Sequence, residues 1–289
     1  MYIFIAIRKR VTYICIQNIP LDSITHIILG AAIGDTLLGK RIGRKAAAIG
    51  AFAKTLPDFD LFYTGLNDAR LYMCHHRGHT HSLLWQFLFA FPIAYLFYLL
   101  FKKRIAYRDW FVLFLVCLWG HSLLDTCTNY GTRLFLPLTN HAYSWNNLSI
   151  VDLVYTVPML FLLLAGLIAA NQSKWRLILI RSLLVYCGIY LAYTSFNKVN
   201  ANAIVQKSLQ ENNISYTKFM SNPTILNNIL WYGEAVNDSN LYIGEFSFLH
   251  PTKPIQWFTY PRNTYLLETH PDTRDIKTLQ WFSNGYILA

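Results

Sequence analysis

Four long apolar segments stand out in the pattern of hydrophobic and polar positions. Each has about the 17 to 25 residues that a helix needs to cross a bilayer, so the pattern predicts four membrane-spanning helices. They occupy residues 83–101, 110–127, 151–170 and 177–196. The second segment contains His121 and Asp125, and the fourth contains Arg181. Ionisable groups inside a membrane are costly, and they are usually functional or placed near a helix end.

Two shorter runs rich in glycine and alanine precede these segments, at residues 22–38 and 45–56. Each run is too short to cross a bilayer comfortably, but small residues suit close packing between helices. Asp22 or Ser23 supplies an N-cap for the first run, and Pro57 stops the second. We therefore expect two buried or partly inserted helices beside the spanning ones.

The pattern changes after residue 196, where polar, Asn-rich stretches alternate with short aromatic runs such as residues 241–248 and 255–260. Alternating apolar and polar positions bounded by Asn, Asp, Pro and Gly predict strands and turns. The fold class that follows is mainly α. We expect a polytopic membrane helical bundle over residues 21–196 and a small C-terminal β-rich soluble domain over residues 197–289.

Residues 1–20 do not fit this organisation. They are apolar but carry three adjacent charges, from Arg8 to Arg10, which neither a signal peptide nor a spanning helix tolerates. We expect this segment to be a doubtful N-terminal extension, with translation starting at the Leu21 codon. N-terminal sequencing of the expressed product that found residue 2 or 3 would contradict this expectation.

Composition supports the membrane interpretation. Hydrophobic residues make up 54% of the 289 residues, charged residues only 14%, and the mean hydropathy is +0.28. The formal net charge of +10 raises the possibility of nucleic-acid binding. However, the basic residues form short clusters between apolar runs and not a stripe with interleaved aromatic residues. We therefore expect no nucleic-acid partner and interpret the clusters as signals of membrane orientation.

The basic clusters set an orientation through the positive-inside rule. If the helical elements alternate up and down, three basic connections fall on one face, which should be cytoplasmic. These connections contain Lys40, Arg41, Arg44 and Lys45, then Lys102, Lys103, Arg104 and Arg108, then Lys174 and Arg176. The opposite, extracytoplasmic face then collects the chemically interesting polar residues and the C-terminal domain.

The residues 75–82, HHRGHTHS, contain four of the nine histidines. Neutral imidazole is the commonest protein metal ligand, and Arg77 adds an anion-binding charge, so the stretch indicates a metal site that acts on an oxyanionic substrate. The alternative is a solvated surface loop that happens to be rich in histidine. The five cysteines form no C-x-x-C pair, so any metal must be held by histidines and carboxylates.

Other candidate ligands recur at suitable spacings. His121 and Asp125 lie four residues apart on one helix face, and Asp58 and Asp60 can direct two carboxylates to one region. Asp22 and His26 lie four residues apart in the same way at the start of the first helix. Taken singly, Asp22 also reads as a helix cap, His26 as a helix-end residue and the Asp58 and Asp60 pair as a turn motif. Together with His76 and His81, they form an oxygen and nitrogen set that suits one to three divalent ions, with zinc or manganese favoured.

Six motifs in order resemble one family. The motifs are DSITH at 22–26, PDFD at 57–60, HRGHTHS at 76–82, GHSLLD at 120–125, NYGT at 129–132 and IVD at 150–152. This signature is similar to that of the YdjM-type family, which is described as membrane-bound metal-dependent hydrolases. The resemblance covers residues 21 to about 160 and implies a multi-pass protein of the bacterial inner membrane.

The resemblance also implies a set of ligands. More distantly, the motifs are similar to the first half of the zinc-dependent phospholipase C and single-strand nuclease group, whose members hold several zinc ions. The implied ligands are His26, Asp58, His76, His81, His121 and Asp125. A later H-x-x-x-E motif of that group is missing here, so one or two metal ions are expected, with Zn²⁺ first and Mn²⁺ second. By this motif, His75 and His79 are not expected to be metal ligands.

The implied activity is metal-assisted hydrolysis of a phospholipid or a similar phosphoester or ester at the extracytoplasmic membrane face. Asp60 is the expected general base if it is not itself a ligand. Arg77 is expected to hold an anionic headgroup, with a structural pairing to Asp58 or Asp60 as the alternative. Thr80, Ser82 and Ser122 are either hydrogen-bond supports of the ligands or helix caps, and Tyr130 and Arg133 are expected at the substrate entrance.

Two other classes of function stay open. The first is a non-enzymatic membrane protein in which the metal ties helices together and the C-terminal domain binds an unknown protein partner. The second is a transporter, which fits less well because the polar residues cluster at one face. A catalytic site keeps an open coordination position beside a cavity, whereas a structural site is closed by protein ligands. For the hydrolase, the expected partners are membrane lipid and an amphiphilic substrate.

Overall fold

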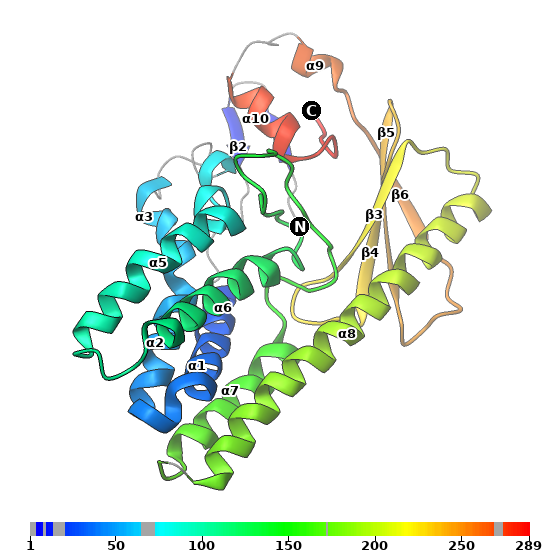
Figure 1. Cartoon of the computed structure of the whole chain (residues 1–289). Coiled ribbons are helices and arrows are strands. Elements are labelled where there is room, and N and C mark those ends of the chain that lie inside the picture. The colour runs from blue at the N-terminus through cyan, green and yellow to red at the C-terminus, as the bar shows by residue number, and fades with distance from the viewer. Residues whose placement is uncertain (1–3, 8–9, 14–20, 65–72, 172, 269–273) are drawn as a thin grey trace.

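The computed structural model describes residues 4–7, 10–13, 21–64, 73–171, 173–268 and 274–289. Helices form most of the described residues between 21 and 211, and a β-sheet and two short helices follow (Figure 1). The helices are α1 (Leu21–Ile42), α2 (Arg44–Thr55), η1 (Leu56–Phe59), α3 (Asp60–Thr64), η2 (His79–His81), α5 (Leu83–Leu100), α6 (Tyr107–Asp125), α7 (Leu153–Ile168), α8 (Lys174–Glu211), α9 (Tyr265–Glu268) and α10 (Arg274–Phe282). Within the first twenty residues, β1 (Phe4–Ile7) pairs with β2 (Arg10–Tyr13).

Helices α1 and α2 form a tightly packed antiparallel pair because glycines line their contact. A Cβ atom added to Gly50 would lie 2.1 Å from the carbonyl oxygen of Gly30 and 2.7 Å from the Cα atom of Gly34. Gly43, with φ of 62°, provides the reversal between the helices. The reversal places the end of α2 level with the beginning of α1. The two short runs predicted from the sequence therefore form helices, and their pairing brings the PDFD segment beside His26.

Helices α5 and α6 also form an antiparallel pair, and polar contacts hold the start of α5 to the end of α6. The Gln86 side chain donates hydrogen bonds to the Ser122 hydroxyl (2.6 Å) and to the Thr80 carbonyl (2.8 Å). The Ser82 hydroxyl donates to the Leu136 carbonyl in the loop that follows α6. The His-rich stretch therefore lies beside the carboxyl end of α6.

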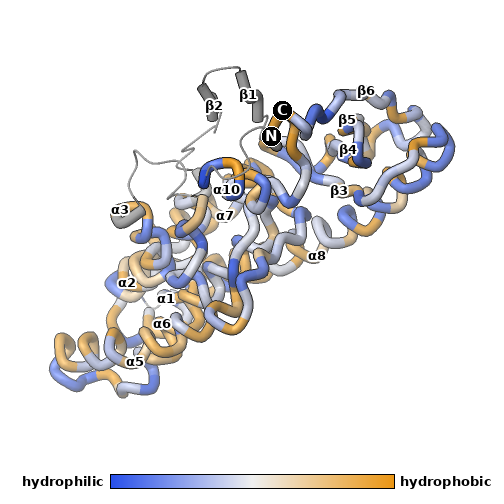
Figure 2. The backbone as a smooth tube through the Cα atoms, turned by 90° about the horizontal axis from the view of Figure 1, so that it is seen from above, coloured by the Kyte–Doolittle hydropathy of each residue, from blue (hydrophilic) through white to orange (hydrophobic). Residues whose placement is uncertain are grey.

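Two described helices, α5 and α8, are long and apolar enough to cross a membrane by their length and composition. The expectation of four such helices is therefore met only in part. Helix α7 is apolar but has 16 residues, which is fewer than the roughly 20 that a bilayer requires. Helix α6 is a core helix that buries Trp110 and Phe114 completely. Figure 2 shows hydrophobic residues concentrated along α5, α6 and the neighbouring helices, away from the sheet.

The C-terminal sheet is a four-stranded antiparallel meander in the order β3-β4-β5-β6. Its strands are β3 (Lys218–Pro223), β4 (Leu230–Val236), β5 (Asn240–Ser247) and β6 (Gln256–Pro261). The two aromatic runs predicted as strands form β5 and β6. Beyond the sheet, this part of the chain also contains the short helices α9 and α10, which the polar and aromatic pattern did not predict.

Helix α8 joins the two parts and continues past residue 196, where the apolar pattern predicted its end. The reason is that its later turns find a second apolar partner in the sheet. Ala201, Val205 and Leu209 are fully buried together with Trp231 and Ala235 of β4. The same helix thus packs against α7 at one end and against the sheet at the other.

Candidate metal centre

Four side chains bring one donor atom each to a common point. Asp58 comes from η1, His81 from η2, and His121 and Asp125 from the last turn of α6. His81 Nε2 lies 3.1 Å from His121 Nε2, 3.2 Å from Asp125 Oδ2 and 3.5 Å from Asp58 Oδ1. His121 Nε2 lies 3.3 Å from Asp58 Oδ1 and 3.4 Å from Asp125 Oδ2. We refer to these four residues as the four-donor set.

Five separations within the four-donor set are close to those expected between the ligands of one ion. Zinc binds imidazole nitrogen and carboxylate oxygen at about 2.0–2.2 Å, and a tetrahedron with bonds of that length has edges of about 3.3–3.6 Å between ligand atoms. The five distances given above span 3.1–3.5 Å. Two overlapping groups of donors are close enough to share an ion, namely Asp58 with His81 and His121, and His26 with His121 and Asp125.

The tautomers of both histidines suit metal binding. His121 Nδ1 lies 2.6 Å from the Lys54 carbonyl oxygen, which only accepts hydrogen bonds, so Nδ1 carries a proton. His81 Nδ1 lies 2.9 Å from the Thr80 hydroxyl, and that hydroxyl donates to Asp60 (2.8 Å). The Nδ1 atom of His81 is therefore also the donor. Both Nε2 atoms are left as the basic nitrogens that face each other.

Two basic nitrogens and two carboxylate oxygens at these distances require a positive charge between them, either a proton or a metal ion. The pKa values outside the helical segments point the same way. Burial alone would raise the pKa of Asp58, but the charge of His121 and hydrogen bonds from His121 and His81 lower it well below its usual value. Burial alone would lower the pKa of His81, but its contacts with the carboxylates of Asp125 and Asp58 raise it. The pocket thus stabilises cations.

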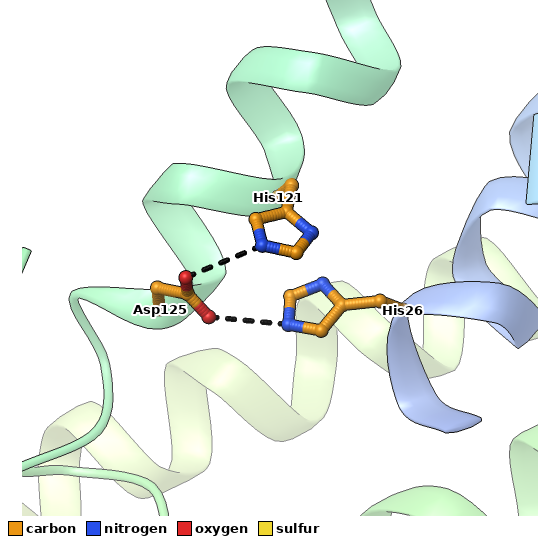
Figure 3. Close-up of side chains that lie close together, drawn as sticks. All are labelled: His26, His121 and Asp125. Atoms are coloured by element: carbon orange, nitrogen blue, oxygen red, sulfur yellow. Dashed lines mark hydrogen bonds and ion pairs between the residues drawn. The ribbon is translucent and has the colours of Figure 1, made fainter. Parts of the chain in front are cut away.

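The two carboxylate oxygens of Asp125 make different contacts. Oδ1 accepts hydrogen bonds from His26 Nε2 (3.1 Å) and is 3.3 Å from Arg77 Nη2. Oδ2 has no hydrogen-bond donor among the residues that the structure describes, and it faces the two histidines of the four-donor set. Figure 3 shows the carboxylate between His121 on its own helix and His26 on α1. A metal ion would satisfy Oδ2.

His26 therefore lies next to the four-donor set, where it contacts Oδ1 of Asp125. A carboxylate only accepts hydrogen bonds, so His26 Nε2 carries the proton in this arrangement. The His26 ring also stacks on that of His121, with ring centroids 3.8 Å apart. Its nitrogen is close enough to share an ion with His121 and Asp125, but its present contact orients Asp125.

Asp60 and His76 form a second group behind His81. Asp60 Oδ1 lies 2.9 Å from His76 Nδ1, and Oδ2 accepts hydrogen bonds from Thr80 and from the backbone N–H of Arg77. Burial alone would raise the pKa of Asp60, but the hydrogen bond with His76 and the charges of His81 and His76 lower it. Asp60 thus fixes the orientation of His81 through Thr80, a contact that tunes metal ligands in many proteins.

The Arg77 side chain is directed to Asp125 and not to Asp58 or Asp60. Its Nη1 atom donates to the Thr128 hydroxyl (2.8 Å) and to the Asp125 carbonyl (3.3 Å), and its guanidinium lies 5.0 Å from the centre of the Tyr130 ring. Arg77 has a positive φ of 55°, which is unfavourable for a residue with a side chain. This backbone geometry is compensated by the contacts that hold Asp125 and the loop after α6.

The outer side of the centre is covered by the C-terminal segment. Tyr130 lies between His76 and Phe282 of α10, with ring centroids 5.4 and 5.1 Å apart. The Arg133 guanidinium lies 5.5 Å from the centre of the Trp281 ring. Tyr130 and Arg133, expected at a substrate entrance, therefore contact α10.

Solvent reaches the four-donor set at Asp58. The Asp58 side chain is 16% exposed, whereas those of His81, His121 and Asp125 are at most 1% exposed. His75 and His79 are exposed on the outside of the stretch, and neither belongs to the groups of residues able to share an ion. Sequence reasoning missed one neighbour, the fully buried Lys54. The only signal was a lone lysine within an alanine-rich run just before the PDFD motif.

Comparison with known proteins gives one match. The profile of the YdjM inner membrane protein family matches residues 21–200, a range that contains the whole four-donor set and the helices that carry it. No curated protein and no solved structure matches the chain. Because the matched range covers more than half of the 289 residues, the chain belongs to the YdjM inner membrane protein family.

Proposed function

We propose that this protein is a membrane-bound, metal-dependent hydrolase of a phospholipid or a similar phosphoester or ester. The observation that carries the proposal is the four-donor set, whose spacing fits one divalent ion and whose only solvent-exposed member is Asp58. A divalent ion there would supply Lewis-acid chemistry, because it lowers the pKa of bound water and polarises a phosphoryl or acyl oxygen. Zn²⁺ suits the ligands best, followed by Mn²⁺.

The protein's own side chains would orient the metal ligands and accept a proton during hydrolysis. His26 and Arg77 orient Asp125, and Asp60 orients His81 through Thr80. The pair formed by Asp60 and His76 is the candidate proton acceptor. Because His76 Nδ1 hydrogen-bonds to Asp60 Oδ1, its Nε2 is the basic nitrogen of the ring.

Purified protein in detergent should hydrolyse a phosphodiester or phospholipid substrate when it is loaded with Zn²⁺ or Mn²⁺. We expect turnover to disappear after treatment with a chelator and to return when the metal is restored. The assay should include water-soluble phosphodiesters, carboxylic esters and a panel of phospholipids in mixed micelles. Stoichiometric metal with no turnover on the whole panel would refute the enzyme and leave the metal centre intact.

A second function has one observation in its favour. Four protein donors would leave no open coordination position on a four-coordinate ion, and three of them are almost completely buried, as in a structural metal site. In that case the ion would tie η1 and η2 to α6 and support a protein that binds a partner through its C-terminal domain. The chelator experiment separates the two proposals, because a structural ion would raise the melting temperature without turnover.

We also propose that the protein crosses the inner membrane several times, with the metal centre and the sheet on the extracytoplasmic side. The basic connections gather at the opposite end of the helices. Arg41 pairs with Asp109 at the start of α6, and Arg44 Nε donates to the Leu167 carbonyl near the end of α7. Positive charge at one end favours a cytoplasmic position for that end. At 1.5 Å per residue, the 38 residues of α8 extend about 57 Å, well beyond a bilayer.

A reporter that is active only outside the cytoplasm tests this orientation. Fused after Ala289, it should be active, whereas fusions within residues 102–106 should be silent. Normal expression with a silent C-terminal fusion would reverse the orientation. The four-donor set would then face the cytoplasm.

A further inference from the structure

Lys54 is a buried lysine beside the four-donor set. It lies near the end of α2 and is completely buried, and among the residues that the structure describes its Nζ atom has no hydrogen-bond partner. The ammonium group occupies space that Gly120 leaves open, since a Cβ atom added to Gly120 would lie 3.0 Å from Nζ. Gly120 immediately precedes His121, whose Nδ1 donates to the Lys54 carbonyl.

A charged group buried without a hydrogen-bond partner is energetically costly and needs compensation by opposite charge nearby. The other lysine with a largely enclosed ammonium group, Lys198 of α8, is different because its Nζ atom donates to both the carbonyl and the hydroxyl of Ser221. The acidic groups that act on the Lys54 ammonium group are the thiol of Cys117, the carboxylate of Asp125 and the thiol of Cys187, and Asp125 is the only carboxylate among them. The lysine is therefore electrostatically part of the centre.

A count of formal charges shows what Lys54 changes. The centre and its supports contain three carboxylates, Asp58, Asp60 and Asp125, and two cations, Lys54 and Arg77. With the histidines counted as neutral, the formal charges sum to −1 without the proton or metal ion that the donors hold, and to +1 with a divalent ion. Without Lys54, the corresponding sums are −2 and 0. The lysine thus opposes the binding of a cation and makes the loaded centre positive.

We propose that Lys54 is a built-in counter-cation that weakens metal binding and gives the loaded centre affinity for an oxyanion. The substrate class this favours is an anionic phosphoester, in preference to a neutral carboxylic ester. The inference rests on the metal centre of the proposed function and deepens it. Lys54 is a positioning residue here, because it acts through the charge of the centre and lies too deep to touch a substrate.

Lys54→Met, which removes the charge but keeps the side-chain length, should change two affinities in opposite directions. Titration calorimetry with Zn²⁺ alone should give binding to the variant that is roughly tenfold tighter than to the wild type, because a repulsion in a medium of low dielectric constant is lost. Inorganic phosphate should bind the zinc-loaded variant roughly tenfold more weakly. Structural damage would weaken both affinities.

Lys198→Met is the matched control, because it removes a lysine from α8 away from the centre, and it should leave both affinities unchanged. If Lys54→Met fails to fold, Lys54→Gln serves the same comparison. Unchanged or weaker zinc binding by a folded Lys54 variant would overturn the inference, as would unchanged phosphate binding. No zinc binding by the wild type would instead refute the metal centre, so the two failures are distinguishable.

Discussion

Asp125→Ala is expected to abolish stoichiometric binding of a divalent ion. The substitution removes a donor oxygen of the four-donor set, and it also leaves the Arg77 guanidinium and the His26 ring without their common acceptor. Mutation of an outer hydrogen-bond partner typically lowers metal affinity by 10 to 100-fold, and loss of a ligand should cost far more. Metal content after dialysis and titration calorimetry with Zn²⁺ would measure the effect.

Two further variants make this experiment specific. Asp60→Asn should lower the affinity for Zn²⁺ only by about 10 to 100-fold, because Asp60 acts on His81 through Thr80. Asp152→Asn should leave the affinity unchanged, since this buried carboxylate caps α7 and accepts a hydrogen bond from Tyr190. Full metal occupancy in Asp125→Ala would show that the four donors do not form the binding site.

Asp35→Ala is expected to lower the free energy of unfolding by about 3–5 kcal/mol. Asp35 of α1 pairs with the Arg176 guanidinium at the start of α8, and both side chains are about 5% exposed. Removing one partner leaves an uncompensated charge in a buried position, which is the costly case for an ion pair. Arg176 Nη1 also donates to Asn171 (2.6 Å), which retains part of its hydrogen bonding. Denaturant titration in detergent would measure the loss.

The double variant Asp35→Ala with Arg176→Met tests the reason for that loss. Because it removes both charges, it should be more stable than Asp35→Ala alone. The pair between Arg41 and Asp109 serves as an exposed control, since the Arg41 side chain is 54% exposed, and Arg41→Ala should cost about 0–1 kcal/mol. A double variant less stable than Asp35→Ala would contradict the charge argument.

The apolar pattern predicted local structure well where a helix contacts one kind of environment. Residues 83–101 form α5, and the aromatic alternations form β5 and β6. The pattern did not distinguish a lipid-facing helix from a core helix. Helix α6 has a long apolar run, yet it is not one of the described helices that are apolar enough to cross a membrane, and its Trp110 and Phe114 are buried in the protein. Hydropathy reports the polarity of a side chain and not the partner that removes it from water.

The difference between the polarity of a side chain and the partner that buries it also explains where α8 ends. The apolar run ends near residue 196, but the helix continues to Glu211 because Ala201 and Val205 pack on β4. That partner is more than twenty residues away in the sequence. The sequence of residues 197–211, which is mostly polar, does not by itself indicate that this part of the helix packs on a sheet.

By itself, the sequence determined which residue types are available for chemistry and near which helix ends they lie. The spacing of His121 and Asp125 placed both on one face of a helix, and the PDFD and HRGHTHS motifs supplied further donors.

Only the tertiary structure decided how these donors divide into roles. It brings His81 and His121 within 3.1–3.5 Å of each other and of the carboxylates of Asp58 and Asp125, and it places His26, Asp60 and Arg77 beside them as hydrogen-bond partners. The physical reason is that coordination depends on the direction of single donor atoms. Those directions are set by contacts between distant segments, such as the glycine contact of α1 with α2 and the Lys54 carbonyl on His121.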